Sequence, residues 1–259
     1  NPDAKWTNGE IVKPEHFLYS WERILSPDLG AQYADMLYVI KNAENFHKGQ
    51  IRVPGTKIST TNESELLTIT TSSEHDLSIG NVISLDGFSN TGGISSDNIN
   101  KTFSILSVPS NKTFMVSLGV KAKSNAISSA STLIKPFNDF SKVGVSAFEN
   151  KLVVTLENPT PYFLNILTHY STWPVHPETV EKFGGMTSRT NQWTRVNNFI
   201  GNGPFKLESW EINKSLKVSR NDLYWGNNSN KINGIEFLPI DNELTQDRLF
   251  RSGGIHLAN

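Results

Sequence analysis

The stretch GNGPFKLESWE, residues 201–211, raises the first question about the fold. Two glycines flank an asparagine, as in a loop that holds phosphate, but a dinucleotide-binding loop follows a strand and opens a helix. Here the residues after Pro204 alternate between apolar and polar types, which predicts a strand, and the third glycine of such a loop is missing. We therefore interpret residues 201–203 as a turn that begins a strand.

The residues that follow predict a small antiparallel sheet and a helix. A short Asn-Lys turn separates the alternating runs 205–212 and 215–220, so these should pair as a hairpin. Residues 232–240 form a third β-rich run, and residues 241–254 predict a helix with Asp241 as N-cap and Gly253 as its end. Residues 255–259 are expected to start another strand.

The N-terminal and central parts mix helices with one hairpin. Residues 13–25 place apolar side chains on one helical face behind Pro14, which suits a first helical turn. Further helices are expected at 31–40, 161–169 and 176–184, and a hairpin at 143–156 with its tip at 149–150. The fold class predicted from these elements is mixed α/β (α+β).

Residues 51–136 differ in composition from the rest of the chain. All 6 Trp and all 6 Tyr lie outside this segment, whereas 27 of its 86 residues are Ser or Thr. Its β-rich runs (66–70, 81–85, 101–108 and 112–118) are separated by turn signals, which indicates a small sandwich or barrel. We predict an all-β module inserted into a host domain, with residues 121–132 as a flexible connector back to the host.

Composition excludes several functions. The chain carries 24 basic and 25 acidic side chains, which gives no electrostatic reason to expect nucleic acid or an anionic membrane as partner. It contains no Cys, so disulfides, thiolate catalysis and Cys-ligated zinc are excluded, while the compartment stays open. The chain opens with NPDAKWTNGE, which lacks an initiator Met and reads as folded material, so we expect that processing or truncation removed earlier residues.

Several host segments together resemble the extracytoplasmic solute-binding proteins of peptide ABC transporters, the oligopeptide/dipeptide-binding family. The resemblance rests on five ordered segments: DAKWTNGEIVKPEHFLYSWERILSP (3–27), VVTLENPTPYFLNILTH (153–169), NGPFKLESWE (202–211), VSRNDLYWG (218–226) and RSGGIHLAN (251–259). Family members are longer than this chain, so the resemblance implies an internal portion of a binding protein. The module at 51–136 is absent from the ordinary family pattern and resembles small β-modules of surface and tail-like proteins.

The resemblance implies a partial, clam-like periplasmic-binding-protein fold of type II. Residues 1–50 and 137–176 would belong to the smaller lobe and residues 177–259 to part of the large ligand-binding lobe. The implied protein is a monomer located in the periplasm or at the cell surface, where a lipid anchor would be compatible with its role. Its partners would be short peptides, held mainly through their backbones in wet side-chain pockets, and an ABC transporter permease.

Three residues match family positions near the ligand. Tyr33 matches a tyrosine near the peptide cleft, and His169 matches a histidine that borders a side-chain pocket. Asn259 falls where the family often has a cleft tyrosine, so this sequence departs from the family at that position. For each, a structural role is the competing interpretation: a core tyrosine, a histidine bonded within the fold, or a strand residue without ligand contact.

Catalytic, cofactor and metal sites are not expected. His169 and His176 are seven residues apart, which is not the i,i+4 spacing of a metal-binding pair on one helical face. Glu178 and Glu181 are interpreted as structural, because the helix dipole favours carboxylates in the first turns of a helix. Trp210 and Trp225 are interpreted as core residues. Two alternatives stay open: a scaffold whose β-module binds a protein or surface, and a receptor for another solute such as a nickel complex, haem or an oligosaccharide.

Overall fold

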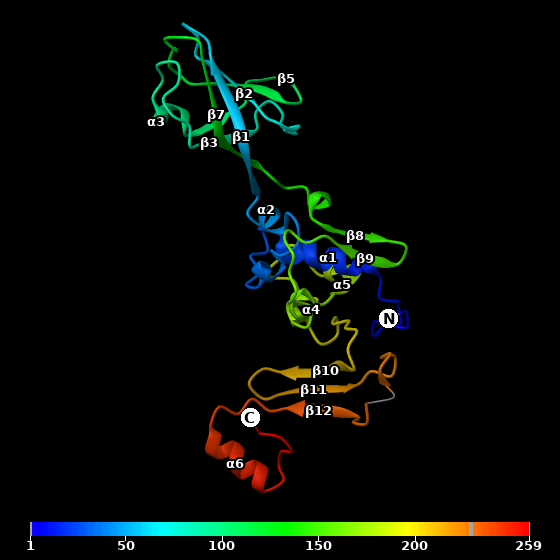
Figure 1. Ribbon diagram of the computed structural model, residues 1–259. Helices are drawn as coiled ribbons and strands as arrows, with labels where there is room; N and C mark the ends of the chain where they lie inside the picture. The colour runs from blue at the N-terminus through cyan, green and yellow to red at the C-terminus, as the bar shows by residue number, and fades with distance from the viewer. Residues whose placement is uncertain (1, 228–229, 259) are drawn as a thin grey trace. The chain divides into compact units, whose positions relative to one another are not determined.

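A computed structural model describes residues 2–227 and 230–258, and these residues form two compact units (Figure 1). Unit 1 comprises Asn1–Ile24, Ser146–Val153 and Leu164–Asn259, and unit 2 comprises Leu25–Val145 and Val154–Phe163. The assignment of residues 1–50, 137–176 and 177–259 to two lobes stays a prediction.

Most of unit 2 is a sheet of seven strands with one short helix, α3 (Ser96–Ile99), between β3 and β4. In sheet order the strands are β4, β3, β7, β1, β2, β6 and β5, and every pair is antiparallel. Their bounds in chain order are β1 (Gln50–Thr60), β2 (Leu66–Thr70), β3 (Val82–Asp86), β4 (Thr102–Ser104), β5 (Ser107–Ser110), β6 (Thr113–Ser117) and β7 (Ala126–Pro136).

The sheet closes into a barrel because its two outermost strands are neighbours in the chain. Only Ile105 and Leu106 separate β4 from β5. The Ile105 N–H donates to the carbonyl of Asn81 beside β3, and the Leu106 N–H donates to the carbonyl of Met115 in β6, both at 2.9 Å. One bent segment therefore pairs with both ends of the sheet, and closure of this kind removes free strand edges.

Inward-facing side chains fill the barrel with its own apolar core. The alternation expected at Phe114 and Val116 is observed, since both are fully buried while Thr113 and Met115 are not. The core cluster consists of Ile58, Leu67, Ile69, Leu77, Ile83, Leu85, Phe88, Ile94, Ile99, Phe103, Ile105, Phe114, Val116, Leu118, Ala122 and Leu133. All of these residues lie within the segment predicted to be an all-β module.

The barrel begins and ends at the same place. β1 and β7 pair over most of their length, with Gln50 opposite Pro136, and the Phe137 N–H donates to the carbonyl of Gly49 at 3.0 Å. The proximity of residues 50 and 137 on which the insertion hypothesis depends is thus confirmed. The prediction of a flexible connector at 121–132 was wrong, because its second half forms β7. Serine-rich composition suggested a linker there, but pairing with β1 and β3 makes it a strand.

The rest of unit 2 consists of η1 (Ala34–Leu37), α2 (Ala43–His47), η2 (Phe140–Lys142) and the segments on either side of the hairpin that was predicted at 143–156. Lys41 N–H donates to the Thr155 carbonyl at 2.9 Å, and Gly144 N–H donates to the Lys41 carbonyl at 2.8 Å. A Cβ added at Gly144 would lie 2.5 Å from the Thr155 oxygen, so only glycine permits this close approach. These hydrogen bonds join a segment that precedes the barrel in sequence to two segments that follow it.

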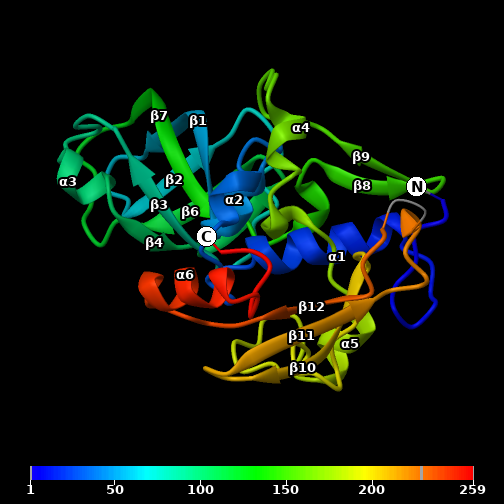
Figure 2. The ribbon, with the colours of Figure 1, turned by 90° about the horizontal axis from the view of Figure 1, so that it is seen from below.

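Unit 1 contains the long helix and the second sheet. α1 (Pro14–Leu25) lies in it except for its last residue, and the expected hairpin is β8 (Val145–Phe148) with β9 (Lys151–Val154). The second sheet consists of the antiparallel strands β10 (Phe205–Glu211), β11 (Ser215–Arg220) and β12 (Gly234–Phe237), which lie side by side in both ribbon views (Figures 1 and 2). The remaining elements are α4 (Phe163–Ile166), η3 (Tyr170–Thr172), α5 (Pro177–Lys182) and α6 (Glu243–Arg251).

A bulge in β10 gives this second sheet one apolar face. Leu207 is opposite Val218 and Trp210 is opposite Leu216, with a register shift between Leu207 and Ser209. Because Leu216 and Val218 are two residues apart, the shift brings Leu207 and Trp210 to the same face although they are three apart. The other face is polar, and there Lys217 pairs with Glu236 at 3.2 Å.

Several local predictions need correction. Residues 31–40 hold only the 3₁₀ turn η1 rather than a full helix, and residues 255–258 form no strand. The N-cap of α6 is Asn242, whose side chain accepts from the Thr245 N–H, and not Asp241. In the described residues, no helix is both long enough and apolar enough to cross a membrane.

The barrel core predicts an effect that is local to unit 2. Ile69 is fully buried and Ile127 is 77% exposed, so Ile69→Ala should cost about 2–5 kcal/mol of unfolding free energy and Ile127→Ala within about 0.5 kcal/mol. Every Trp belongs to unit 1. The urea unfolding transition of Ile69→Ala followed by far-UV circular dichroism should therefore show the loss of stability, while the transition followed by Trp fluorescence should stay where it is in the parent chain. Equal shifts of both signals would contradict a separate barrel core.

Candidate functional site

The most densely connected group of polar side chains in unit 1 surrounds His176, which is 3% exposed. His176 is the N-cap of α5, and its Nδ1 accepts from the Thr179 N–H at 3.3 Å and lies 2.8 Å from the Thr179 hydroxyl. Pro177 then occupies the first turn, where a missing N–H costs nothing. The cap and the proline explain why the helix starts here and why the imidazole is held in one orientation.

Trp6 and His16 form the buried side of this cluster. The Trp6 Nε1–H donates to His16 Nδ1 at 2.9 Å, and the Lys13 N–H donates to the same nitrogen at 3.2 Å. The Trp6 ring also packs edge-on against His176, with ring centroids 5.2 Å apart. Two donors aimed at one nitrogen require that nitrogen to be unprotonated, and burial lowers the pKa of His16 below its ordinary value.

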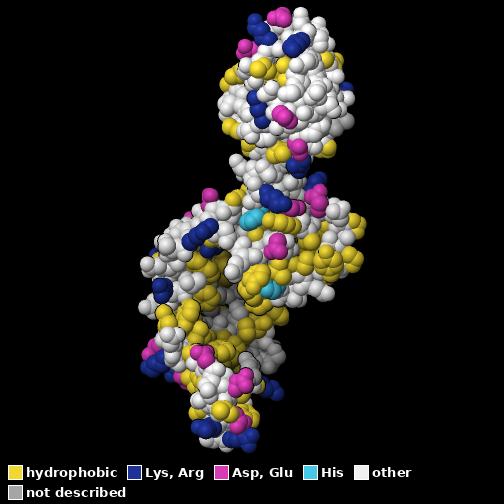
Figure 3. Space-filling model, turned by 90° about the vertical axis from the view of Figure 1, so that its left-hand side faces the viewer, with side chains coloured by type: hydrophobic (Ala, Val, Ile, Leu, Met, Phe, Trp, Pro, Cys, Tyr) yellow, Lys and Arg dark blue, Asp and Glu magenta, His cyan; other side chains and the backbone are white. Residues whose placement is uncertain are grey.

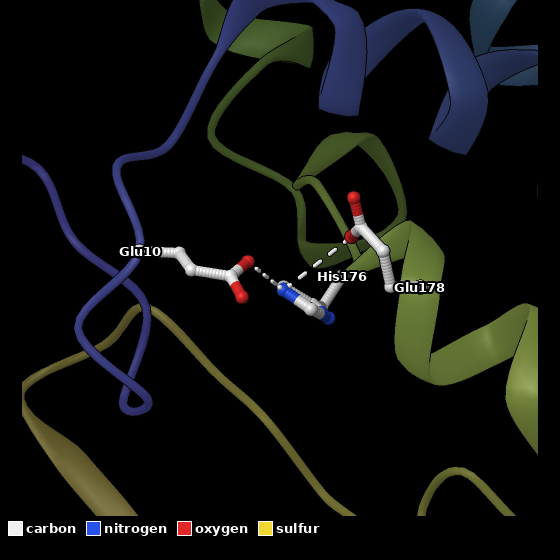
Figure 4. Close-up of side chains that lie close together, drawn as sticks. All are labelled: Glu10, His176 and Glu178. Carbon is white, nitrogen blue, oxygen red and sulfur yellow. Dashed lines mark hydrogen bonds and ion pairs between the residues drawn. The ribbon is translucent and has the colours of Figure 1, made fainter.

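Two carboxylates form the exposed side of the cluster (Figure 4). Glu10 Oε2 lies 2.7 Å and Glu178 Oε2 3.5 Å from His176 Nε2. The side-chain hydrogen bond from His176 holds the pKa of Glu10 below its ordinary value. Asn8 supports the loop, because its Oδ1 accepts from the Glu10 N–H at 3.1 Å.

A second polar link joins α1 to α5. The Tyr19 hydroxyl donates to Glu181 Oε1 at 2.6 Å. Burial, and then this bond to a carboxylate, raise the pKa of Tyr19 well above its ordinary value. Burial lowers the pKa of Arg23, which shares this environment. These groups hold two helices together and present no activated nucleophile.

The turn at 201–203 is held by neighbours and not shaped to hold a ligand. The Thr7 N–H donates to the Gly201 carbonyl at 2.8 Å, and the Asn221 side-chain amide donates to the Gly203 carbonyl at 2.9 Å. Asn221 is 2% exposed, and its own N–H donates to the Pro204 carbonyl. Residues 201–202 are irregular and a bend at 203–204 leads into β10, so the prediction that a strand follows the glycines is confirmed.

A half-open hollow of about 470 Å³ lies in unit 1. Its apolar lining comes from Phe17 of α1, Leu152 of β9 and the side chains of Ile11 and Trp225, and its polar lining includes Lys13, Asn150 and Asn202. Neither Tyr33 nor His169 lines it. The hollow is thus a surface that sequence reasoning did not identify, since four distant segments create it.

Two of the three sequence-predicted ligand residues lie within the described part of the chain, one in each unit. Tyr33 belongs to unit 2, precedes η1 and is 41% exposed. His169 belongs to unit 1 and is half-buried as the N-cap of η3, where its Nδ1 accepts from the Ser171 N–H at 3.3 Å. Asn259 lies outside the described residues.

Other sequence interpretations change once burial is known. Trp210 and Trp225, expected in the core, are 54% and 53% exposed, whereas Trp6 and Trp21 are buried. Trp210 does lie on the apolar face of its sheet, but that face is only partly covered in the described residues, and Figure 3 shows apolar side chains on the surface of this region. The contact between Glu10 and His176 has no local sequence signal, because 166 residues separate them.

Comparison with known proteins identifies relatives for the whole chain. A family model described as bacterial extracellular solute-binding proteins, family 5 Middle, matches residues 1–259. The chain is 24% identical over 259 residues to the periplasmic oligopeptide-binding protein OppA of Haemophilus influenzae, covering 99% of this chain and 31% of that protein. Its counterpart in Escherichia coli is 38% identical over 126 residues, which is 48% of this chain and 22% of that protein.

Solved structures with the same fold include OppA proteins. The chain superposes on OppA of Burkholderia pseudomallei with a TM-score of 0.59 at 21% identity, covering 98% of this chain and 32% of that one. The structure of Haemophilus influenzae OppA in complex with RPPGFSPFR gives a TM-score of 0.59 at 22% identity, with 98% and 32% coverage. The mixed α/β chain therefore has part of a type II periplasmic-binding-protein fold. It spans about a third of the length of these proteins.

The His16 environment predicts a pH dependence of stability. Because its pKa is lowered in the folded state, the unfolded chain binds a proton that the folded chain does not, once the pH falls below about 6.5. The unfolding free energy should decrease as the pH falls from 7 to 5. In His16→Asn, which keeps an acceptor near Trp6 but cannot titrate, this decrease should shrink; the exposed His256→Asn is the control. Urea unfolding followed by Trp fluorescence at each pH measures the unfolding free energy. If this free energy falls with pH as steeply in His16→Asn as in the parent chain, His16 is not the group responsible.

Proposed function

Because the chain belongs to family 5 of the bacterial extracellular solute-binding proteins, we propose that the whole protein is the substrate-binding component of an ABC importer. In this proposal it captures short peptides outside the cytoplasmic membrane and delivers them to the permease. The observation that carries the proposal is the match of residues 1–259 to one family, with an oligopeptide-binding fold over 98% of the chain. The protein acts as a monomeric receptor without catalysis.

Peptides are the favoured solute class. The relatives include proteins named for oligopeptide, dipeptide and murein peptide binding, and one solved relative holds the peptide RPPGFSPFR. Relatives named for deoxycholate and glutathione are also similar over about half of this chain. They supply the alternative, a receptor for a different small solute, which the experiment below distinguishes.

Binding would involve the hinge closure of a two-lobed receptor. Ligand that contacts both lobes is bound better by the closed form, so it shifts the population toward closure and toward docking on the permease. Tyr33 offers a phenol hydroxyl from a partly exposed ring, and His169 offers an imidazole that η3 holds in place. We assign both to the ligand cleft, together with Asn259.

The barrel supports a second proposal, an interaction module carried on the receptor. Its core is made wholly of residues from the inserted segment, and its first and last strands pair with each other. Such a body can be added to a receptor without interrupting the receptor core. In this proposal the barrel binds a partner protein or surface while the flanking segments bind solute.

Peptide binding by the longer protein should raise its melting temperature by several degrees in a broad mixture of short peptides, since ligand at 100 times Kd contributes about 2.7 kcal/mol. His169→Ala should weaken binding by roughly fivefold, the scale of one hydrogen bond, while the exposed His256→Ala should not. Differential scanning fluorimetry and isothermal titration calorimetry measure both effects. A shift with deoxycholate or glutathione and none with peptides would support the alternative solute.

Removal of residues 51–136, with Gln50 joined to Phe137 through a short Gly-Ser linker, should leave peptide affinity within about twofold, because the two ends are adjacent in space. Peptide titration of the shortened receptor measures this. Loss of adhesion or partner binding alone would favour the interaction module, whereas loss of peptide affinity would assign the barrel to solute binding.

A further inference from the structure

We propose that Glu10, His176 and Glu178 bind a divalent transition-metal ion of the Zn²⁺ class at the exposed edge of unit 1. One ligand atom from each residue, an imidazole nitrogen and two carboxylate oxygens, lies within 4.8 Å of the others. Local sequence spacing does not indicate a metal here, because Glu10 lies 166 residues from His176 in the chain. The site is independent of the ligand residues assigned above and does not rest on peptide binding.

The imidazole is already fixed in the orientation that a metal ligand needs. His176 is 3% exposed, Trp6 packs edge-on against its ring, and Thr179 contacts its Nδ1. Its Nε2 faces the two carboxylates (Figure 4). A ligand whose ring does not have to be ordered on binding loses less conformational entropy.

The two carboxylates carry negative charge and are exposed to solvent. Glu10 is 56% exposed and Glu178 is 68% exposed, so an ion can reach both carboxylates from solvent. Two negative charges beside a neutral imidazole attract a dication, and imidazole together with carboxylate is a donor set that suits Zn²⁺. Water would complete the coordination, since three protein ligands leave a fourth tetrahedral position open.

The spacing fits an ion after a small movement of one side chain. Two tetrahedral ligands at about 2.0–2.1 Å from Zn²⁺ lie about 3.3 Å apart. The Glu178 oxygen is already 3.5 Å from Nε2, whereas the Glu10 oxygen is at 2.7 Å, a hydrogen-bond distance. Glu10 therefore has to withdraw by about 0.6 Å, which an exposed side chain on a loop can do.

Thr179 makes the required proton shift possible. In the metal-free arrangement Nδ1 accepts from the Thr179 N–H, so the ring proton is on Nε2 and is donated to Glu10. When a metal takes the Nε2 lone pair, that proton moves to Nδ1 and the ring stays neutral. The Thr179 hydroxyl, 2.8 Å from Nδ1, can then accept it. The Thr179 hydroxyl thus serves the metal-bound tautomer, while the Thr179 N–H gives up its hydrogen bond to Nδ1.

The test is a titration of the 259-residue chain with ZnCl₂ by isothermal titration calorimetry, alongside Glu10→Gln, Glu178→Gln and His176→Asn. The asparagine variant keeps an N-cap acceptor for α5, and Glu208→Gln is an exposed control with the same change of charge. We expect one site in the parent chain and in the control. Each of the three site variants should bind at least about tenfold more weakly, the scale that even a supporting residue contributes.

Two spectroscopic readouts separate a built site from surface adsorption. Co²⁺ bound by the cluster should show the ligand-field absorption of a low-coordinate site, and ZnCl₂ should move the His176 ring proton from Nε2 to Nδ1 in ¹⁵N-resolved NMR spectra. Absence of saturable binding, or equal affinities in Glu178→Gln and Glu208→Gln, would overturn the proposal. So would binding that leaves the His176 tautomer unchanged.

Discussion

The antiparallel pairing of β1 with β7 is the constraint on which the organisation of the chain depends. Backbone hydrogen bonds between these strands bring Gln50 opposite Pro136, so the chain leaves the flanking segments and returns to them at one point. The seven-stranded sheet can then close on itself, and its apolar core forms without help from residues outside it. The same pairing lets Lys41, Gly144 and Thr155 meet although the barrel separates the first from the other two in sequence. Without it, the segments that match the family would be divided by a long loop with a large closure entropy.

Unit 1 is held together differently, by buried polar groups whose partners are specific. Its buried set includes His16, His176, Thr172 and Asn221 beside Trp6 and Trp21. Such groups are costly unless they are paired, and each of these four is: His16 with Trp6, His176 with Thr179, Thr172 with the His169 carbonyl, and Asn221 with Gly203. A core of this kind specifies one arrangement of loops more strictly than apolar packing does, because a shift of one partner leaves another buried group without a hydrogen bond. This is why the turn at 201–203 is ordered although glycine favours many conformations.

The sequence predicted local elements better than long-range ones. Periodicity located α1, the hairpin β8–β9, and strands β2, β6 and β10, because each signal lies within a few residues. The strand β7 was interpreted as a linker because alternation is weak in AISSASTLIKP, and pairing with β1 and β3 decides its structure. The bulge that brings Trp210 to the apolar face is a property of two strands and has no signal in β10 alone. The approach of Glu10 to His176 is likewise set by the tertiary fold, so no local pattern could reveal it.

The residues that carry the family resemblance are mostly those that hold unit 1 together. Trp6 of the WTNGE segment donates to His16, Trp21 of YSWE donates to the Thr172 carbonyl at 2.9 Å, and Asn221 of RNDLYW ties down Gly203. These roles are structural, so the segments report a shared scaffold and say little about the ligand that each family member binds. That is consistent with relatives named for oligopeptides, glutathione and deoxycholate matching the same chain. Solute preference must therefore come from side chains other than those that hold this shared scaffold together.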